Sequence, residues 1–475
     1  MPTIQPPNGT RDFYPEDALR RRYITEAWRA ASLRHGFDEI DGPTFEHLDL
    51  YTVKSGEGIV SELFSFERFG GEKKSALRPE FTPTLARMYA AKAASLPKPT
   101  KWFMAGPFFR AERPQRGRLR EFLQWNCDIL GLDVEWGGKA GGGKAGGGGK
   151  ESQIAEGAEE PAEIAEAKAR ADAECIACCV ELLRGLGLTS TDLQICISNR
   201  RTVLSIVRRY CTSEATDDQL LTLLDRRSKL PAEEIAAQAA AIGLDLAGAD
   251  VTMNRIEIEG MLASNVATVL SGQPREEDRY TVTFGQCIRA AGLGEWIKFD
   301  FSIVRGLAYY TGMVFEVIVD GERAVAGGGR YDNLIELFGG PPTPAVGFGM
   351  GDVVLSLVLK DKGLLPEGKE LADLLDSPRC RASVRPDVFV ISNGQPECDS
   401  VVPTLMSQAR ARGLHARRSY KTTKKIPKLL ADAAAQSARH ALIIESSETC
   451  TLKNLDNQSQ ESMSIDEAMK RLAPS

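Results

Sequence analysis

GPFFRAERPQRGRLREFLQWNCDILG, residues 106–131, holds five arginines within eleven residues, with Glu112 as the one acid among them. An apolar run precedes this arginine-rich turn, and an alternating apolar/polar run follows it. A solvated loop is the ordinary alternative for such a run, but like charges this close repel one another unless they share an anion. Guanidinium groups bind phosphate through paired hydrogen bonds, so the turn favours a site for a phosphate chain. The five are Arg110, Arg113, Arg116, Arg118 and Arg120.

The alternating run predicts a strand with two different faces. In residues 121–131, EFLQWNCDILG, apolar residues occupy every second position, as a strand period requires. The other face is polar and suits either solvent or the wall of a site. The polar face consists of Gln124, Asn126 and Asp128, opposite Leu123, Trp125, Cys127 and Ile129.

A second polar face is predicted upstream, in residues 77–87, LRPEFTPTLAR. As a strand, this stretch places Arg78, Glu80 and Thr82 on one side. An arginine-rich turn between two such strands would set its cations beside a polar surface, where a phosphate chain could lie.

The chain is long enough for two or three domains and carries no overall positive charge. It has 475 residues and a formal charge of −6, so a nucleic-acid site must be a local patch. No apolar run approaches the roughly 20 residues that cross a bilayer, and residues 1–17 lack the apolar core of a signal peptide. We therefore expect a cytoplasmic protein without a membrane segment.

The cysteines and histidines do not favour metal or Ser-His-Asp chemistry. Cys175, Cys178 and Cys179 lie among apolar residues at helical spacing, which indicates core packing, and no second pair completes a zinc site. The four histidines are far apart in the sequence. We therefore predict no metal-ligating residues.

Residues 1–187 contain two predicted helices and a glycine-rich linker. The helices occupy residues 16–36 and 161–187, the second starting at Pro161. Residues 136–153 are low in complexity and predict a flexible linker. A P-loop fits the same glycine and lysine spacing, but Ala145 replaces the Ser or Thr that would hold magnesium, and no helix opens there.

The rest of the chain predicts an insertion and a second α/β unit. Strands are expected at residues 193–199 and 313–319, and residues 200–292 between them read as a helical, polar insertion. From residue 385 strands and helices alternate to the end.

Four further motifs accompany residues 106–131: GFDEIDGPTFE (36–46), VRGLAYYTGMVFE (304–316), AGGGRYDNL (326–334) and PAVGFGMG (344–351). Together with the opening NGTRDFYPED they resemble the histidyl-tRNA synthetase family of class II aminoacyl-tRNA synthetases. Residues 36–46, 106–131 and 344–351 resemble motifs 1, 2 and 3, and the other two resemble the family's histidine-specific signatures. The resemblance covers nearly the whole chain except the glycine-rich linker.

The resemblance implies an α+β fold, with a mostly antiparallel class II sheet of six or seven strands flanked by helices. Residues 1–365 would form the catalytic domain with its helical insertion, and residues 385–475 a C-terminal α/β anticodon-binding domain. The implied ligase reaction joins L-histidine to ATP, supplied with Mg2+, as histidyl-adenylate and releases pyrophosphate. The histidyl group then passes to the 3′ end of tRNA(His). Motif 1 implies a homodimer.

For ATP, the resemblance assigns a role to each of several residues. Arg110 is implied to grip the α-phosphate, Glu112 to hold the adenine amino group and Phe122 to stack under the ring, with Arg118 beside them. Arg305 matches the arginine that replaces a catalytic magnesium contact in this family. Arg110 and Arg305 are therefore the expected catalytic residues.

For histidine, the resemblance implies an acid and a hydroxyl, Asp128 and Tyr310, that bracket the imidazole and read both ring nitrogens. Glu80 and Thr82 are implied to bind the α-amino group, with Gln124 near the carboxylate. The full implied set is Glu80, Thr82, Gln124, Asp128, Arg305, Tyr309, Tyr310 and Gly328.

Two regions are implied to contact tRNA. Gln115 and Arg120 in the arginine-rich turn would read the acceptor end. Residues 409–428 hold eight cations and no acid, which favours phosphate contact with the anticodon stem through residues such as Arg417 and Lys424. A solvated charged face is the alternative for this basic stretch.

Two positions depart from the family pattern. Val354 stands where motif 3 usually ends in an arginine that meets the γ-phosphate, and Ala308 replaces the usual aspartate of RGLDYY. Candidates for the missing γ-phosphate contact are Arg87, Arg113 and Arg330. The rival to an active ligase is a catalytically inactive relative with a regulatory or tRNA-sensing role.

Overall fold

The structure is a computed structural model of the chain. It describes residues 4–55, 60, 62–67, 73–132, 160–227, 230–253, 279–301, 303, 310–319, 324–376, 383, 385–421 and 423–472. The predicted linker at 136–153 lies outside the described residues, as do Arg305, Ala308 and Tyr309.

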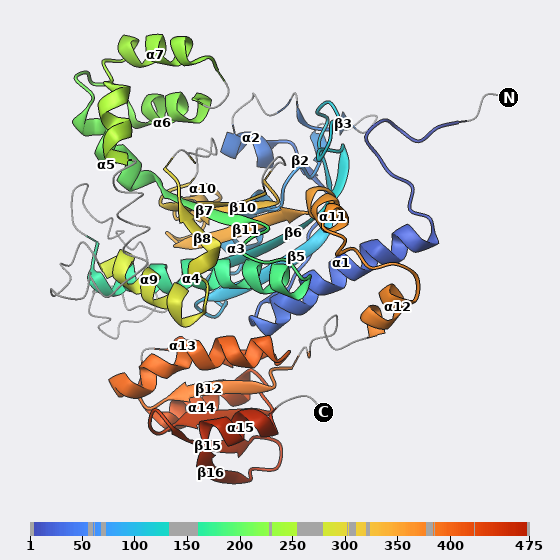
Figure 1. Cartoon of the computed structure of the whole chain (residues 1–475), viewed down its shortest axis with the longest axis vertical. Helices are drawn as coiled ribbons and strands as arrows, with labels where there is room; N and C mark the ends of the chain where they lie inside the picture. The colour runs from blue at the N-terminus through green and yellow to red at the C-terminus, as the bar shows by residue number, and fades with distance from the viewer. Residues whose placement is uncertain are drawn as a thin grey trace.

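An eight-stranded sheet forms the centre of the molecule (Figure 1). Its inner strands are antiparallel, and a short strand pairs in parallel at each edge. The sheet therefore has more strands than the expected six or seven. The order is β1 (Asp38–Glu39), β5 (Thr100–Phe109), β6 (Glu121–Leu130), β11 (Ala345–Gly351), β10 (Ala326–Arg330), β9 (Met313–Ile318), β7 (Gln194–Asn199) and β8 (Ile297–Phe299).

Strand β6 lies inside this sheet and has the two faces that its alternation predicted. It pairs antiparallel with β5 and with β11. Trp125, Cys127 and Ile129 belong to the main hydrophobic cluster, whereas Gln124 and Asp128 line a cavity on the other face. The arginine-rich turn joins β5 to β6, so the predicted strand–turn–strand is confirmed.

Helices α1 (Pro15–Arg34), α4 (Ala162–Gly185) and α9 (Arg279–Ala290) cover the apolar face of the sheet. The helices predicted at 16–36 and 161–187 are confirmed as α1 and α4. Cys175, Cys178 and Cys179 of α4 are fully buried in this cluster, as predicted for core cysteines.

The other face of the sheet packs against α3 (Thr82–Ala90) and α10 (Leu334–Leu337). A small sheet in the order β2 (Phe45–His47), β4 (Lys74–Leu77) and β3 (Ser65–Glu67) lies beside it, next to α2 (Asp49–Ser55). The strand predicted across residues 78–82 is wrong, because β4 ends at Leu77 and Thr82 is the first residue of α3. Arg78 is therefore separated from Glu80 and Thr82. Its buried guanidinium bonds Asp41 and the carbonyl oxygens of Gly42 and Pro107.

The polar block that begins at residue 200 is helical. Helices α5 (Arg200–Arg209), α6 (Asp217–Arg226) and α7 (Ala232–Ala241) have a hydrophobic cluster of their own and stand apart from the sheet in Figure 1. Helix α9, within the same predicted insertion, packs on α4 in the main cluster instead. The extent of the insertion as a domain stays a prediction.

The C-terminal part has the predicted α/β alternation. Helices α11 (Asp352–Asp361) and α12 (Gly368–Asp376) lead to a second sheet in the order β13 (Ala416–Arg418), β12 (Val388–Ser392), β14 (His440–Ile444), β15 (Thr449–Asn454) and β16 (Gln460–Ser464). Its helices are α13 (Pro396–Ala411), α14 (Ile426–Ala435) and α15 (Ile465–Arg471). Helix α13 lies between this sheet and the main body in Figure 1. No helix among the described residues is long and apolar enough to span a membrane.

Candidate active site

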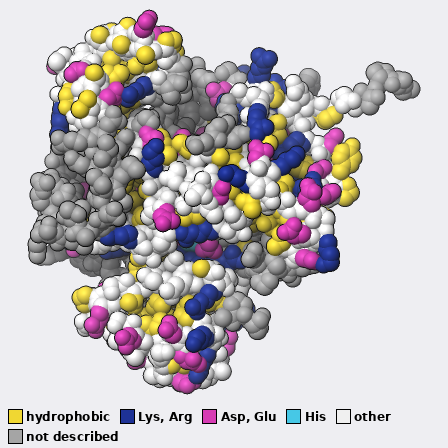
Figure 2. Space-filling view, viewed as in Figure 1, with side chains coloured by type: hydrophobic (Ala, Val, Ile, Leu, Met, Phe, Trp, Pro, Cys, Tyr) yellow, Lys and Arg dark blue, Asp and Glu magenta, His cyan; other side chains and the backbone are white. Residues whose placement is uncertain are grey.

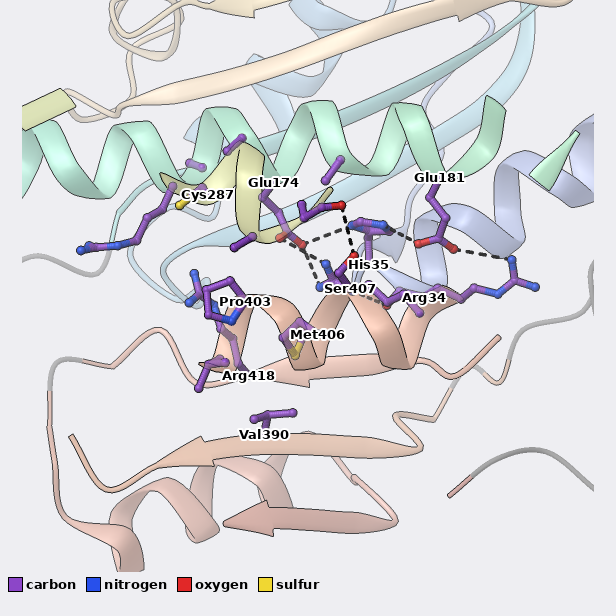
Figure 3. Close-up of a pocket in the computed structure, with 18 of the residues that line it drawn as sticks. Arg34, His35, Glu174, Glu181, Cys287, Val390, Pro403, Met406, Ser407 and Arg418 are labelled. Carbon is purple, nitrogen blue, oxygen red and sulfur yellow. Dashed lines mark hydrogen bonds and ion pairs between the residues drawn. The ribbon is translucent and has the colours of Figure 1, made fainter. Parts of the chain in front are cut away.

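Two cavities in the described parts of the chain are lined by different sets of residues. The larger, about 1410 Å³, lies between α1, α4 and α9 on one side and the C-terminal unit on the other (Figure 3). The smaller, about 230 Å³, is lined by the polar face of β6, by β11, and by part of the arginine-rich turn. The smaller cavity is the candidate active site, because most of the residues implied to bind ATP and histidine line it. These are Glu80, Thr82, Arg110, Arg118, Phe122, Gln124, Asp128 and Tyr310.

Glycines of β11 make room for the polar side chains of β6. Asp128 pairs with Gly347 in the register of the two strands. A Cβ atom on Gly347 would lie 1.9 Å from Asp128 Oδ1, and one on Gly349 would lie 2.1 Å from Gln124 Nε2. Real Cβ atoms do not approach so closely, so the alternate glycines of GFGMG keep this floor open. These glycines belong to the motif 3 stretch at 344–351, and the sequence pattern alone did not predict this role for them.

Asp128 is a buried carboxyl at one end of the cavity. It is 5% exposed and accepts a hydrogen bond from the hydroxyl of Tyr331. Burial raises the pKa of Asp128 to about 7, because a charged carboxylate is poorly solvated there, and the Tyr331 bond only partly offsets this effect. Tyr331 also lines the cavity and was missed as a site residue, although it lies within the quoted AGGGRYDNL stretch.

Arg110 and Phe122 form another part of the wall. The Arg110 guanidinium lies 5.0 Å from the centre of the Phe122 ring, and its Nε donates to the Pro79 carbonyl oxygen at 3.2 Å. Burial lowers the pKa of Arg110, although Glu80 and Glu112 oppose that shift. Arg110 makes no ion pair with any residue in the described parts of the chain. The arrangement leaves a cation and an aromatic ring beside the polar face of β6.

The rest of the arginine-rich turn is held by internal contacts. Arg118 forms an ion pair with Glu112, and Arg120 Nε donates to the Glu112 carbonyl oxygen at 3.1 Å. Arg116 pairs with Asp361 at 3.1 Å. Of this group only Arg118 lines the cavity, whereas Glu112, Gln115 and Arg120 lie outside its wall.

Gly328 is not part of the cavity wall; its neighbour Gly327 is. A Cβ atom on Gly328 would lie 2.2 Å from the carbonyl oxygen of Gly347, so this glycine allows β10 and β11 to pack closely. Its close approach is therefore to a neighbouring strand, and its contact with histidine stays a prediction.

The structure narrows the candidates for the γ-phosphate contact. Val354, at the motif 3 position, lines the cavity. Arg330 is 3% exposed and pairs with Asp172 at 2.5 Å and Asp332 at 3.0 Å, away from the cavity wall, so its candidacy is wrong. Arg87 pairs with Glu46 at 2.6 Å, and Arg113 is exposed; neither lines the cavity, so both stay candidates.

The basic stretch at 409–428 is not uncompensated, so that part of the prediction is wrong. Arg410 pairs with Glu174 at 2.8 Å, Arg417 with Asp38 at 2.7 Å, and Lys421 with Asp432 at 3.1 Å. Lys424 Nζ donates to the Gly394 carbonyl oxygen. Acidic side chains are interspersed with Lys and Arg on the visible face of the C-terminal unit in Figure 2.

An ionic network beside the larger cavity explains why Arg410 is buried. In Figure 3, Glu174 and Glu181 of α4 point toward His35, and α13 lies opposite them. His35 Nε2 lies 2.7 Å from Glu181, and Glu174 also binds Lys101 at 2.8 Å. Burial alone would raise the pKa of Glu174, but Arg410 and Lys101 outweigh it and hold that pKa well below its usual range. Arg410 therefore joins the C-terminal unit to the main body.

Comparisons with known proteins agree with this architecture. The family model described as histidyl-tRNA synthetase matches residues 9–134 and 149–352. A histidine–tRNA ligase from Haloarcula marismortui is 38% identical over 365 residues, which cover 75% of this chain and 75% of that protein. A histidine–tRNA ligase from Pyrococcus abyssi is 32% identical and covers 99% of this chain and 98% of its own.

Solved structures give the same fold. The crystal structure of histidyl-tRNA synthetase from Nostoc sp. PCC 7120 has a TM-score of 0.55 and 21% sequence identity, and covers 99% of this chain and 99% of its own. The family model and the relatives of similar length place this sheet, its motif 2 turn and its C-terminal unit in one known family. The chain belongs to the histidyl-tRNA synthetase family.

Proposed function

We propose that the smaller cavity is where this histidine–tRNA ligase activates L-histidine with ATP, before it transfers the histidyl group to tRNA(His). The observation that carries the proposal is the convergence of Arg110, Phe122, Gln124 and Asp128 on one cavity. Phe122, Gln124 and Asp128 lie at even positions of β6, so strand geometry sets them along one face, and Arg110 follows the end of β5 at the start of the turn. Family membership supports the ligase reaction itself.

ATP binds at the Phe122 end of the cavity. The adenine ring stacks on Phe122, and Arg110 bonds the α-phosphate through its guanidinium, which Phe122 and the Pro79 carbonyl orient. Arg118 stands close enough to the cavity to meet the same phosphates, with Glu112 behind it. The adenine amino group is assigned to Glu112, and Arg87 and Arg113 are the candidates for the γ-phosphate.

Histidine binds at the Asp128 end. Asp128 and Tyr310 hold the two ring nitrogens, and Glu80 and Thr82 hold the α-amino group. Gln124 lies nearer the phosphates and meets the carboxylate. A substrate without the ring nitrogens would leave buried Asp128 with the Tyr331 hydroxyl as its one described side-chain partner, which supports discrimination without an editing step.

The reaction brings two anions together. One carboxylate oxygen of histidine attacks the α-phosphorus, the bond from that phosphorus to the bridging oxygen breaks, and pyrophosphate leaves. Fixed cations that neutralise the α-phosphate matter more here than an acid or a base. Arg110 supplies one such cation, and Arg305 is proposed as the second, also contacting the carboxylate. Mg2+ enters as the counter-ion of ATP.

Contacts with tRNA(His) are proposed on both units. Gln115 and Arg120 lie on the arginine-rich turn outside the cavity, which suits contact with the acceptor end. For the anticodon stem, Lys424 and Arg417 stay proposed contacts, although Arg417 is only 16% exposed and already pairs with Asp38. Lys424 is the better candidate of the two because its one described bond is to a backbone carbonyl.

The test of the proposal is histidine-dependent exchange of pyrophosphate into ATP by the purified chain. We expect exchange with histidine and none above background with other amino acids. Absence of exchange at saturating ATP and histidine would contradict the proposal and favour a regulatory or tRNA-sensing relative.

We also propose that the chain is a homodimer joined near its motif 1 stretch. Phe45 and Phe66 are 55% and 45% exposed, and their rings meet edge to face at 5.7 Å between centroids. A paired aromatic surface of this kind suits an interface. We expect the double variant Phe45→Asp/Phe66→Asp to sediment as a monomer at micromolar concentration, where the wild-type chain sediments as a dimer.

The matched control for the dimer is Val251→Asp. Val251 is 71% exposed and lies in the helical insertion. This variant should stay dimeric. A wild-type chain that sediments as a monomer, or a double variant that stays dimeric, would contradict the proposed interface.

A further inference from the structure

Asn126 has an unsatisfied hydrogen-bond donor inside the candidate active site. Its side chain is 5% exposed and lines the smaller cavity. Its Oδ1 accepts a hydrogen bond from Gln124 Nε2 at 3.0 Å, but Nδ2 has no partner in the described parts of the chain. Leaving a buried donor unpaired costs about 1–3 kcal/mol, so native proteins rarely do so without a reason. At a substrate cavity, the reason is an acceptor that arrives with the substrate.

The neighbours of Asn126 fix the orientation of its amide. The bond from Gln124 holds Oδ1 toward the phosphate end of β6. Gly349, the partner of Asn126 in the register, has no side chain to cover it, and a Cβ atom there would lie 3.3 Å from Asn126 Oδ1. Because Oδ1 is engaged, Nδ2 is the atom left to meet a ligand.

The position of Asn126 along β6 indicates which part of histidine it meets. It lies two residues from Asp128 and two from Gln124, so roughly 7 Å separates it from each along the strand. The imidazole is proposed at Asp128 and the phosphates beyond Gln124. Asn126 therefore lies beside the amino and carboxylate groups of the bound histidine, between its imidazole ring and the reacting phosphate.

The hydrogen-bonding chemistry of the Asn126 amide indicates which group of histidine it binds. An amide N–H donates and cannot bind the α-ammonium group, which has only donors and is assigned to Glu80 and Thr82. The carboxylate is the acceptor that remains. Resting on the proposed function, we propose that Asn126 Nδ2 binds the non-reacting carboxylate oxygen of histidine, and that Asn126 is a substrate-binding residue of this ligase.

The proposal predicts a change in binding more than in rate. The oxygen held by Asn126 stays on carbon as the carbonyl oxygen of the adenylate, while the other oxygen forms the bond to phosphorus. The bond to Asn126 is therefore present before and during the reaction, and such uniform binding alters KM with little effect on kcat. The bond to Asn126 also involves the carboxylate alone. The affinity of a ligand that lacks a carboxylate should therefore not depend on Asn126.

The experiment compares wild type with Asn126→Ala in histidine-dependent pyrophosphate exchange, with histamine as a competitive inhibitor. Histamine keeps the imidazole and the amine but lacks the carboxylate. We expect the KM for histidine to rise roughly 10-fold, as for loss of one hydrogen bond to a charged group. The kcat, the KM for ATP and the inhibition constant of histamine should each change by less than about threefold.

Asn126→Asp is the second variant and keeps the acceptor for Gln124. It replaces the donor by an anion that faces the substrate carboxylate, so its KM for histidine should rise at least as far as that of the alanine variant. Equal losses of histidine and histamine affinity would place Asn126 at the ring and overturn the proposal. A wild-type KM in either variant would also overturn it. Failure of wild-type exchange would instead contradict the proposed function.

Discussion

Replacing Arg110 with alanine is expected to slow histidine-dependent pyrophosphate exchange by roughly 100-fold or more at saturating substrates. The loss corresponds to about 3 kcal/mol, which is typical when an oriented charge that stabilises a transition state is removed. Arg110 is suited to this role because Phe122 and the Pro79 carbonyl fix its guanidinium, and no ion pair with a described residue neutralises it. Initial rates at several ATP concentrations measure the effect.

The fold should survive this substitution. Removing Arg110 leaves no described carboxylate without a salt-bridge partner, so the melting temperature should stay within a few degrees of wild type. Arg110→Lys should recover part of the rate, because lysine keeps the charge but cannot make the paired contacts of a guanidinium.

The matched control comes from the same turn. Arg116 is 62% exposed and pairs with Asp361, outside the cavity wall. Arg116→Ala should keep exchange within about threefold of wild type, since exposed ion pairs contribute little. Wild-type exchange in Arg110→Ala would contradict the role of Arg110, and an equal loss in Arg116→Ala would show that the turn acts only through its net charge.

Sequence alternation predicted β6 because the strand is two-faced along its whole length. Trp125 and Cys127 belong to the main hydrophobic cluster, while Asn126 and Asp128 face the cavity, so polarity switches at every residue although all four are buried. The same reasoning failed at residues 78–82. Pro79 lies within the apparent alternation and Pro83 follows it, and proline is poorly suited to a strand interior but well suited to the first turn of a helix such as α3.

Partners that are distant in sequence could not be predicted. Tyr331 lies 203 residues from Asp128, and only the pairing of β6, β11 and β10 brings the two together. Arg410 and Arg417 looked uncompensated within their own stretch, yet Glu174 and Asp38 lie 236 and 379 residues away in sequence. Local composition therefore predicted where cations concentrate but not which of them are already neutralised.

Asp128→Asn is expected to stabilise the substrate-free protein at pH 8 while it weakens histidine activation. Burial raises the pKa of Asp128 from 3.8 to about 7 in the folded state, so the fold favours the protonated carboxyl. The folded protein thus binds more protons than the unfolded chain between about pH 4 and pH 7, and its free energy of unfolding falls as pH rises through that window. Above pH 7 this decrease in the free energy of unfolding is complete and amounts to a few kcal/mol. Asparagine cannot ionise, but its Oδ1 can still accept the Tyr331 hydroxyl.

The predicted signature is therefore a stability gain that depends on pH. Urea unfolding of the free protein should show Asp128→Asn more stable than wild type at pH 8, with the difference shrinking toward pH 4. Asp332→Asn is the matched control, for which we expect the opposite change in stability. Arg330 and Lys168 outweigh burial and lower the pKa of Asp332, so its loss should destabilise the protein at pH 8.

Histidine activation should become weaker in the same Asp128→Asn variant, although the free protein becomes more stable. Bound histidine supplies the ring N–H that compensates an ionised Asp128, and a hydrogen bond to a charged group is worth about 1.5–3 kcal/mol. The KM for histidine in pyrophosphate exchange should therefore rise about 10- to 100-fold at pH 8, with the KM for ATP little changed. An Asp128→Asn protein that is less stable than wild type at pH 8, or that binds histidine normally, would contradict the view that this carboxyl is kept buried, at a cost in stability, to recognise the imidazole.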